Sequence, residues 1–280
     1  MTADYQAAPP IAIGPASWRT GLSANALLPA LRRARPVLLP AATGAALLLL
    51  WQLAVAGLRI PAVILPPPTD ILAELWRVLP VLLQQAVPTT LDSVAAFVAA
   101  TLLGVTLAIA ISYSRFLRDM LYPNLVLLQL IPKVALAPLF VVWLGISGQS
   151  RIAFATFIAF FPIVISAAVG FANIDPSALR LCRSLSATEA QCFAMVRFPF
   201  ALPAIFSGMK IAMTMAIIGV IIGEFISSNA GLGYYILYAS SRMETAAIFA
   251  ALSLLCAIGV ALFGAVALAE QLVRRSYGRQ

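Results

Sequence analysis

The chain has 280 residues, of which 62% are hydrophobic and only 10% are charged, and it carries a net charge of +8. Soluble domains contain about 25% charged residues, so this composition excludes an ordinary soluble protein and predicts a polytopic membrane protein. The apolar runs are continuous rather than alternating, which excludes a membrane β-barrel. The chain has no histidine and no CxxC pair among its three cysteines, so we predict no metal site, no catalytic site and no disulfide framework.

Six stretches are long and apolar enough to cross a bilayer as helices, because a hydrocarbon core of about 30 Å requires about 20 residues. In chain order they cover residues 37–57, 91–112, 121–144, 152–171, 205–226 and 246–269. We therefore predict an all-α fold with one transmembrane domain over residues 37–272. An N-terminal tail (1–36) and a short C-terminal tail (273–280) flank this domain.

The arginines divide unevenly between the two sides that six spans define. All but four fall on the side of the two termini, and those four are Arg59, Arg77, Arg151 and Arg242. By the positive-inside rule, both tails are cytoplasmic. The loop between the fourth and fifth spans then lies in the cytoplasm as well.

Between the first two spans, three consecutive prolines precede Thr69 and Asp70. Consecutive prolines force an extended turn, and either following residue can cap a short helix, which we predict over residues 71–79. We interpret the stretch 58–90 as an outer-face connector with a surface helix. Asp92 then lies at the start of the second span, where the helix dipole favours a negative charge.

The third span contains Pro132 and Pro138, each of which removes a backbone donor and kinks the helix. A broken helix at membrane depth is tolerated where it lines a cavity or is buried in protein. Lys133 lies between the two prolines. Two interpretations of this lysine remain open: a functional group within the membrane, or a side chain that extends to the membrane surface.

The fifth span carries Gly219 and Gly223, a pair of small residues at a spacing that permits close helix approach. Glu224 follows at the outer end of this span. It either faces a functional cavity or lies in the outer interface beside Arg242, and we favour the interface.

The stretch after the fifth span, residues 227–238, contains Gly231 and Gly233. These glycines allow a tight turn on the outer face. The tyrosines of the same stretch suit a membrane–water interface. We therefore predict a short outer loop next to the membrane surface.

The loop between the fourth and fifth spans has two helix starts. Asp175 is suited to an N-cap and Pro176 to the first helical position. A second start lies at Ser186, because Ser186 and Glu189 have the spacing of a capping box. The second helix is expected to end before Pro199, since the residue preceding a proline is disfavoured in a helix. We predict a compact helix–bend–helix that is suited to transmit movement to the adjoining spans.

Five stretches in chain order carry a resemblance to a known family. They are LPPPTDIL (65–72), IPKVALAPLFVVWLGI (131–146), FFPIVISAAVGF (160–171), LPAIFSGMKIA (202–212) and GEFISSNAGLGYYI (223–236). The chain resembles the membrane permease subunits of bacterial ATP-binding-cassette (ABC) importers. It is most similar to the branch for nitrate, sulfonate, taurine and thiamine- or riboflavin-precursor uptake.

The cytoplasmic signature of that family is E-A-A, three residues, G, nine residues, then I-x-L-P. On this chain a basic residue, Arg180, stands at the acidic position, and Ser186 stands at the glycine position. The resemblance implies that residues 173–203 form the coupling loop that binds a partner ATPase. The implied contact residues are Arg180, Leu181, Cys182, Leu185, Ser186, Ala187, Glu189, Val196, Phe198 and Pro199.

The resemblance also implies the assembly. Two copies of this subunit would form the translocation path in the bacterial inner membrane, and a periplasmic or lipid-anchored binding protein would deliver the solute. Two cytoplasmic ATPases would bind ATP-Mg, so this chain would be neither an enzyme nor a cofactor binder. Neither of its lysines, Lys133 and Lys210, completes a phosphate-binding G-x-x-x-x-G-K-[ST] motif. Candidate residues of the path are Pro132, Lys133, Pro138 and Glu224.

The alternative is an ion-coupled secondary transporter, which often has inverted repeats and intramembrane acidic residues. We find no convincing repeat, and such a transporter has no need of a helix–bend–helix loop. An intramembrane enzyme is excluded by the absence of histidine and of paired carboxylates within the spans. The sequence does not determine the solute: candidates are a vitamin precursor such as a thiamine pyrimidine or riboflavin, or a sulfonate or nitrate.

Overall fold

The computed structural model describes residues 27–277, and this part of the chain is helical without any strand. It divides between Trp51 and Gln52 into two units. The first unit holds most of α1 (Leu27–Gly57), which begins within the predicted N-terminal tail. The rest of that tail (1–26) and the last three residues lie outside the described residues.

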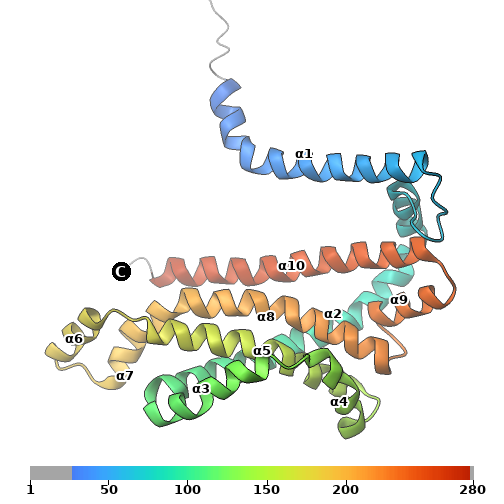
Figure 1. Ribbon diagram of the computed structural model, residues 1–280. Helices are drawn as coiled ribbons and strands as arrows, with labels where there is room; N and C mark the ends of the chain where they lie inside the picture. The colour runs from blue at the N-terminus through green and yellow to red at the C-terminus, as the bar shows by residue number, and fades with distance from the viewer. Residues whose placement is uncertain (1–26, 278–280) are drawn as a thin grey trace, which may run out of the picture. The chain divides into compact units, whose positions relative to one another are not determined.

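The second unit contains the remaining helices (Figure 1). They are α2 (Pro68–Tyr113), α3 (Arg115–Gln129), α4 (Ala137–Leu144), α5 (Gly148–Ala172), α6 (Pro176–Ser184), α7 (Glu189–Cys192), α8 (Phe198–Ser227), α9 (Leu232–Ser241) and α10 (Thr245–Tyr277). Among the described residues, five helices are long and apolar enough to span a membrane. The helix pair α3 and α4, bent by 93° at its break, makes a sixth. These findings confirm the prediction of an all-α membrane protein.

The core of the second unit lies between α2, α5 and α8, and small residues bring these helices close together. A Cβ atom on Gly219 of α8 would lie 2.7 Å from the Cα atom of Ala155 in α5. Gly223, one turn later, faces Arg151 of α5 in the same way. The predicted glycine pair therefore does form a helix contact. Helices in a membrane gain no hydrophobic stabilisation by associating, because lipid tails are as apolar as their side chains. Their association therefore depends on close van der Waals packing of this kind.

The prediction of a separate surface helix over residues 71–79 was wrong. One helix, α2, runs through 46 residues with Pro80 and Pro88 inside it. Leu82 and Ala86, which lie between the two prolines, are buried in a cluster with residues of α9 and α10. This packing keeps the segment helical although each proline removes a backbone donor.

Asp92 therefore lies inside α2, whereas the sequence had predicted it at a helix start. Its Oδ2 atom lies 3.0 Å from the Nη2 atom of Arg151 in α5, and both side chains are largely buried. Arg151, counted among the outer arginines by sequence, therefore neutralises a charge between two core helices.

Candidate functional site at the coupling loop

The first helix of the coupling loop, α6, begins as predicted at Asp175. The carboxylate accepts hydrogen bonds from the Ser177 hydroxyl at 2.5 Å and from the Ser177 backbone amide at 2.8 Å. These two bonds hold the pKa of the Asp175 carboxyl below its usual range. Pro176 occupies the first helical position, where a missing donor costs nothing.

The bend after α6 is made by Ser186, whose φ of +56° lies in the left-handed region. The Ser186 amide donates to the Arg183 carbonyl, and the Ala187 amide donates to the Cys182 carbonyl. This pair of bonds is a Schellman motif, in which the residue at the position of Ser186 is usually glycine. The serine that replaces the signature glycine thus adopts the backbone conformation for which glycine is suited.

The predicted capping box at Ser186 and Glu189 was wrong by two residues. The box is formed by Thr188 and Gln191: the Thr188 amide donates to Gln191 Oε1 at 2.8 Å, and the Gln191 amide donates to Thr188 Oγ1 at 3.3 Å. An N-cap residue requires extended backbone, which Thr188 has and the left-handed Ser186 does not. Glu189 is left free to pair with Arg197, at 3.6 Å.

The chain also stays helical through Pro199, where an end was predicted. A wider π-helical turn, Phe193–Arg197, joins α7 to α8, and the Phe198 amide donates to the Phe193 carbonyl. Pro199 then occupies the first turn of α8.

The coupling loop has a buried side and an exposed side. On the buried side, Val196 and Phe198 pack against the core of α5 and α8. Cys182 and Cys192 are buried free thiols with their Sγ atoms 2.8 Å apart, and they join α6 to α7. On the exposed side, Leu181 and Leu185 keep 63% and 74% of their surface accessible. The exposed predicted contact residues are Arg180, Leu181, Leu185, Ser186 and Glu189.

At the opposite end of the second unit, Glu224 is 1% exposed, so its predicted position in the outer interface was wrong. Glu224 Oε1 accepts a hydrogen bond from the Thr89 hydroxyl, and Oε2 accepts one from the Gly233 amide, both at 2.7 Å. Thr89 Oγ1 in turn accepts from the Leu232 amide. Arg242, the expected neighbour, pairs instead with Glu244 at 2.9 Å.

These bonds attach the outer loop and the start of α9 to α2 and α8. Gln85 of α2 completes the attachment, because its Oε1 atom accepts from the Gly231 amide at 2.6 Å. Gly231 has a φ of +114°, so the expected turn on this loop is present. The sequence analysis missed Gln85 and Thr89. Two polar residues on an apolar helix do not indicate which distant backbone amides they will bind.

The break in the third span extends over Pro132 and the 3₁₀ turn Lys133–Leu136, before α4 begins at Ala137. Lys133 donates to the Gln129 carbonyl at 3.2 Å, and its Nζ atom lies 5.1 Å from the centre of the Phe161 ring. This lysine is partly exposed and has no carboxylate partner among the described residues. Its geometry leaves open the two interpretations made from sequence.

Residues 100–275 match the family model of the binding-protein-dependent transport system inner membrane component. The chain belongs to this family. A probable ABC transporter permease protein of Haemophilus influenzae is 34% identical over 78% of this chain and 89% of its own length. The riboflavin transport permease RibX of Chloroflexus aurantiacus is 32% identical over 82% and 86%. The taurine transport permease TauC of Escherichia coli is 30% identical over 80% and 84%.

The fold is that of a solved ABC permease as well. A chain of the MetNI methionine ABC transporter matches with a TM-score of 0.57 and 20% identity, covering 70% of this chain and 96% of its own. The protein is thus the multi-pass inner-membrane permease subunit of an ABC importer. The family decides between this function and the ion-coupled secondary transporter that the sequence had left as the alternative.

Proposed function

We propose that the exposed side of the coupling loop is the docking surface for a cytoplasmic ATPase that binds ATP-Mg. The observation that carries this proposal is the exposure of Leu181 and Leu185 on a helix pair held by its own caps. Two leucines exposed together on a rigid loop mark an interaction surface. A capped helix pair moves as a unit, so it transmits a push from the partner to α5 and α8.

The two departures from the family signature have different consequences. Ser186 adopts the left-handed conformation expected of glycine, so the bend is preserved. Arg180 is exposed beside the leucines and reverses the charge of the signature residue. We infer that the ATPase contact is mainly apolar and that the partner offers an acidic group opposite Arg180.

The distribution of arginines supports a cytoplasmic location for the coupling loop. The far end carries Arg59, Arg77 and Arg242. The coupling-loop end carries more arginines, and those among the described residues are Arg115, Arg118, Arg180, Arg183, Arg197, Arg274 and Arg275. The side with more arginines and lysines is the cytoplasmic one, and acidic neighbours contribute little to this rule. Both termini are then cytoplasmic, as predicted from sequence.

We infer further that two copies of this chain form the translocation path. The segment around α4 exposes Val142, Trp143 and Ile146 directly after the helix break. Non-helical backbone at membrane depth requires protein around it, which a second copy would supply. Pro132, Lys133 and Pro138 would then lie beside the path. Glu224, which is buried, would hold the outer loop in place rather than contact the solute.

The relatives support a small organic or anionic solute delivered by a binding protein. Their names specify formylaminopyrimidine, riboflavin, taurine and nitrate. We propose a solute of this class, either a vitamin precursor or a sulfonate or nitrate. Transport follows alternating access: ATP binding draws the two coupling loops together and opens the path outward, and hydrolysis returns it inward.

The first test is extraction of the tagged chain from its host membrane and native mass spectrometry. We expect two copies of the chain with two copies of a P-loop ATPase. Leu185→Asp should lower the amount of ATPase recovered with the chain at least tenfold, because it places a charge in an apolar contact. Ile64→Asp, at a similarly exposed residue far from the coupling loop, should retain it. Equal ATPase recovery from both variants would refute the docking surface.

A further inference from the structure

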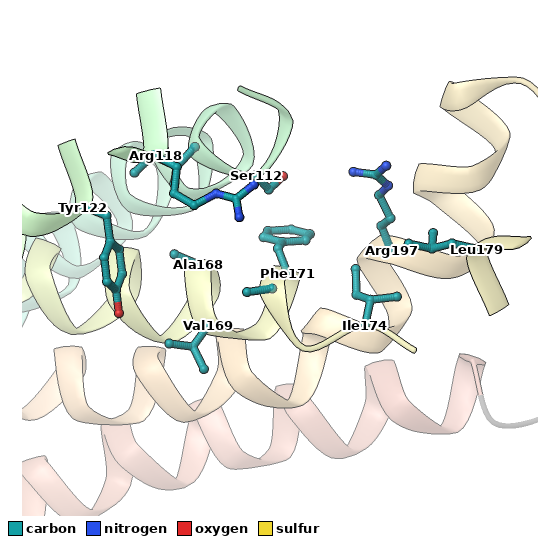
Figure 2. A pocket seen from close by; sticks show the side chains of 11 residues that line it. Ser112, Arg118, Tyr122, Ala168, Val169, Phe171, Ile174, Leu179 and Arg197 are labelled. Atoms are coloured by element: carbon teal, nitrogen blue, oxygen red, sulfur yellow. The ribbon is translucent and has the colours of Figure 1, made fainter. Parts of the chain in front are cut away.

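A cavity of about 430 Å³ lies beside the coupling loop, between the ends of α2 and α5, the start of α3, and α6 (Figure 2). Its walls are mainly apolar, from Ile111, Ala168, Val169, Phe171, Ile174 and Leu179. The volume is in the range of small-molecule sites, which are mostly apolar with a few placed polar groups. The polar groups here are the arginines Arg118 and Arg197 and the hydroxyl groups of Ser112 and Tyr122.

The two arginines approach the cavity from different elements, with the Phe171 ring between them in Figure 2. The side chain of Arg118, on α3, has no hydrogen bond, ion pair or ring contact to any residue within 27–277. Arg197, from the π-helical turn, has a side chain that is only 17% exposed. Its Nε atom is buried and meets no acceptor in the described part of the chain.

The local charge is not balanced. The neighbours recorded for Arg197 are the Tyr113 ring, at 5.1 Å, and the exposed Glu189, at 3.6 Å. Because Glu189 is exposed, its ion pair with Arg197 neutralises little of the guanidinium charge. The two arginines therefore give the cavity a positive potential. A buried guanidinium N–H without an acceptor is costly, and an anionic oxygen in the cavity would satisfy it.

We propose that this cavity binds the phosphate headgroup of an anionic phospholipid. Arg118 and Arg197 hold the phosphate oxygens, since a guanidinium donates paired hydrogen bonds to phosphate. The apolar walls accept the hydrocarbon that follows the headgroup, which a free inorganic anion does not have. Basic pockets between membrane helices at the cytoplasmic side bind anionic lipid headgroups in this way. The lipid would occupy the junction between α3, α5 and the coupling loop.

The test is lipid binding to the purified full-length chain, measured by native mass spectrometry during titration with phosphatidylglycerol or phosphatidylcholine. We expect phosphatidylglycerol adducts to dominate and to weaken about tenfold in Arg118→Gln, which removes one charged contact. Arg115→Gln is the matched control, because Arg115 is an exposed arginine of the same helix that does not line the cavity. This control should bind like the native chain.

Inorganic phosphate in a parallel titration distinguishes the source of the phosphate. Binding of phosphate that depends on Arg118, without binding of phosphatidylglycerol, would overturn the lipid in favour of a soluble phosphate compound. Equal losses in Arg118→Gln and Arg115→Gln would overturn the site. The amount of ATPase recovered with Arg118→Gln is measured in the same experiment and separates this proposal from the docking surface. A variant that loses lipid adducts but still recovers the ATPase supports the lipid site independently of the docking surface.

Discussion

The two ends of the second unit hold their loops by opposite means. The outer loop before α9 is bound to distant helices: Thr89 and Glu224 are 135 residues apart, and Gln85 and Gly231 are 146 apart. The coupling loop is shaped by bonds between residues at most ten positions apart, as at Asp175, at Thr188 and between Cys182 and Cys192. The outer loop is thus attached to distant helices, whereas the polar contacts of the coupling loop lie within the loop itself.

The same contrast is visible in two residues with positive φ. Gly231 has the Glu224 carboxylate directly where a Cβ atom would stand. Ser186 is exposed, and its side chain is accommodated. Gly231 therefore has to be glycine, both for its backbone conformation and for the contact with Glu224, while the bend at Ser186 tolerates a small side chain at a modest cost.

The largest expected effect is that of Glu224→Ala. It removes two buried hydrogen bonds to the carboxylate and leaves the Gly233 amide without an acceptor, which should lower the free energy of unfolding by about 4 kcal/mol. In thermal unfolding of the detergent-solubilised chain, the midpoint should fall by on the order of 10 °C. Glu244→Ala, which removes an exposed ion pair, should cost less than about 1 kcal/mol. Similar midpoints for the two variants would contradict a structural role of the Glu224 network.

Gly231→Ala should have the next largest effect. The backbone at φ +114° and ψ 163° is accessible almost only to glycine, and the added methyl group meets Glu224. We expect a loss of about 3 kcal/mol in unfolding free energy. Gly264→Ala is the matched control, because no atom lies within 4 Å of its Cβ position in α10. That substitution should be neutral or stabilising by up to about 1 kcal/mol. A neutral Gly231→Ala would show that the outer loop rearranges freely.

Ser186→Gly should have the smallest effect, and in the opposite direction. Glycine relieves the left-handed strain but loses more entropy on folding, so we expect a net gain of about 0.5 kcal/mol. Amide hydrogen exchange at residues 181–189 should slow by about twofold, with little change in the global midpoint. Ser184→Gly, which places glycine in the last turn of α6, should instead accelerate exchange there. Faster exchange in Ser186→Gly would contradict the Schellman assignment.

Much of the architecture was predictable because its signals are short in range. Uninterrupted apolar runs identify spans whatever packs against them. Asp175–Pro176 defines a helix start, and Pro132 interrupts a helix, through atoms within one turn of themselves. Pro138, for which a kink was predicted, stands instead in the first turn of α4. The Gly219 and Gly223 pair indicated a helix contact through its spacing alone, although not the partner helix.

The errors arose where a local signal competes with packing. The sequence predicted a connector with a separate helix over residues 71–79, but the buried neighbours in α9 and α10 keep α2 continuous through this segment. Ser186 had the spacing of a capping box, but its backbone belongs to the Schellman motif that ends α6. In that motif Ser186 is left-handed and cannot adopt the extended backbone of an N-cap. The choice between two adjacent capping patterns depends on where the preceding helix stops, which is uncertain by a residue or two from sequence.

The sequence by itself determined that this protein is a helical membrane protein with a helix–bend–helix loop, because composition, caps and prolines act through neighbouring residues. Its five motif stretches carried the resemblance to permease subunits. Only the tertiary structure decided that Glu224 is a buried acceptor, that Asp92 neutralises Arg151, and that two leucines of the coupling loop remain exposed. Each of these outcomes depends on which residues of distant segments pack, or do not pack, against the side chain. That pairing is set by the packing of α2, α5 and α8, which no local pattern encodes.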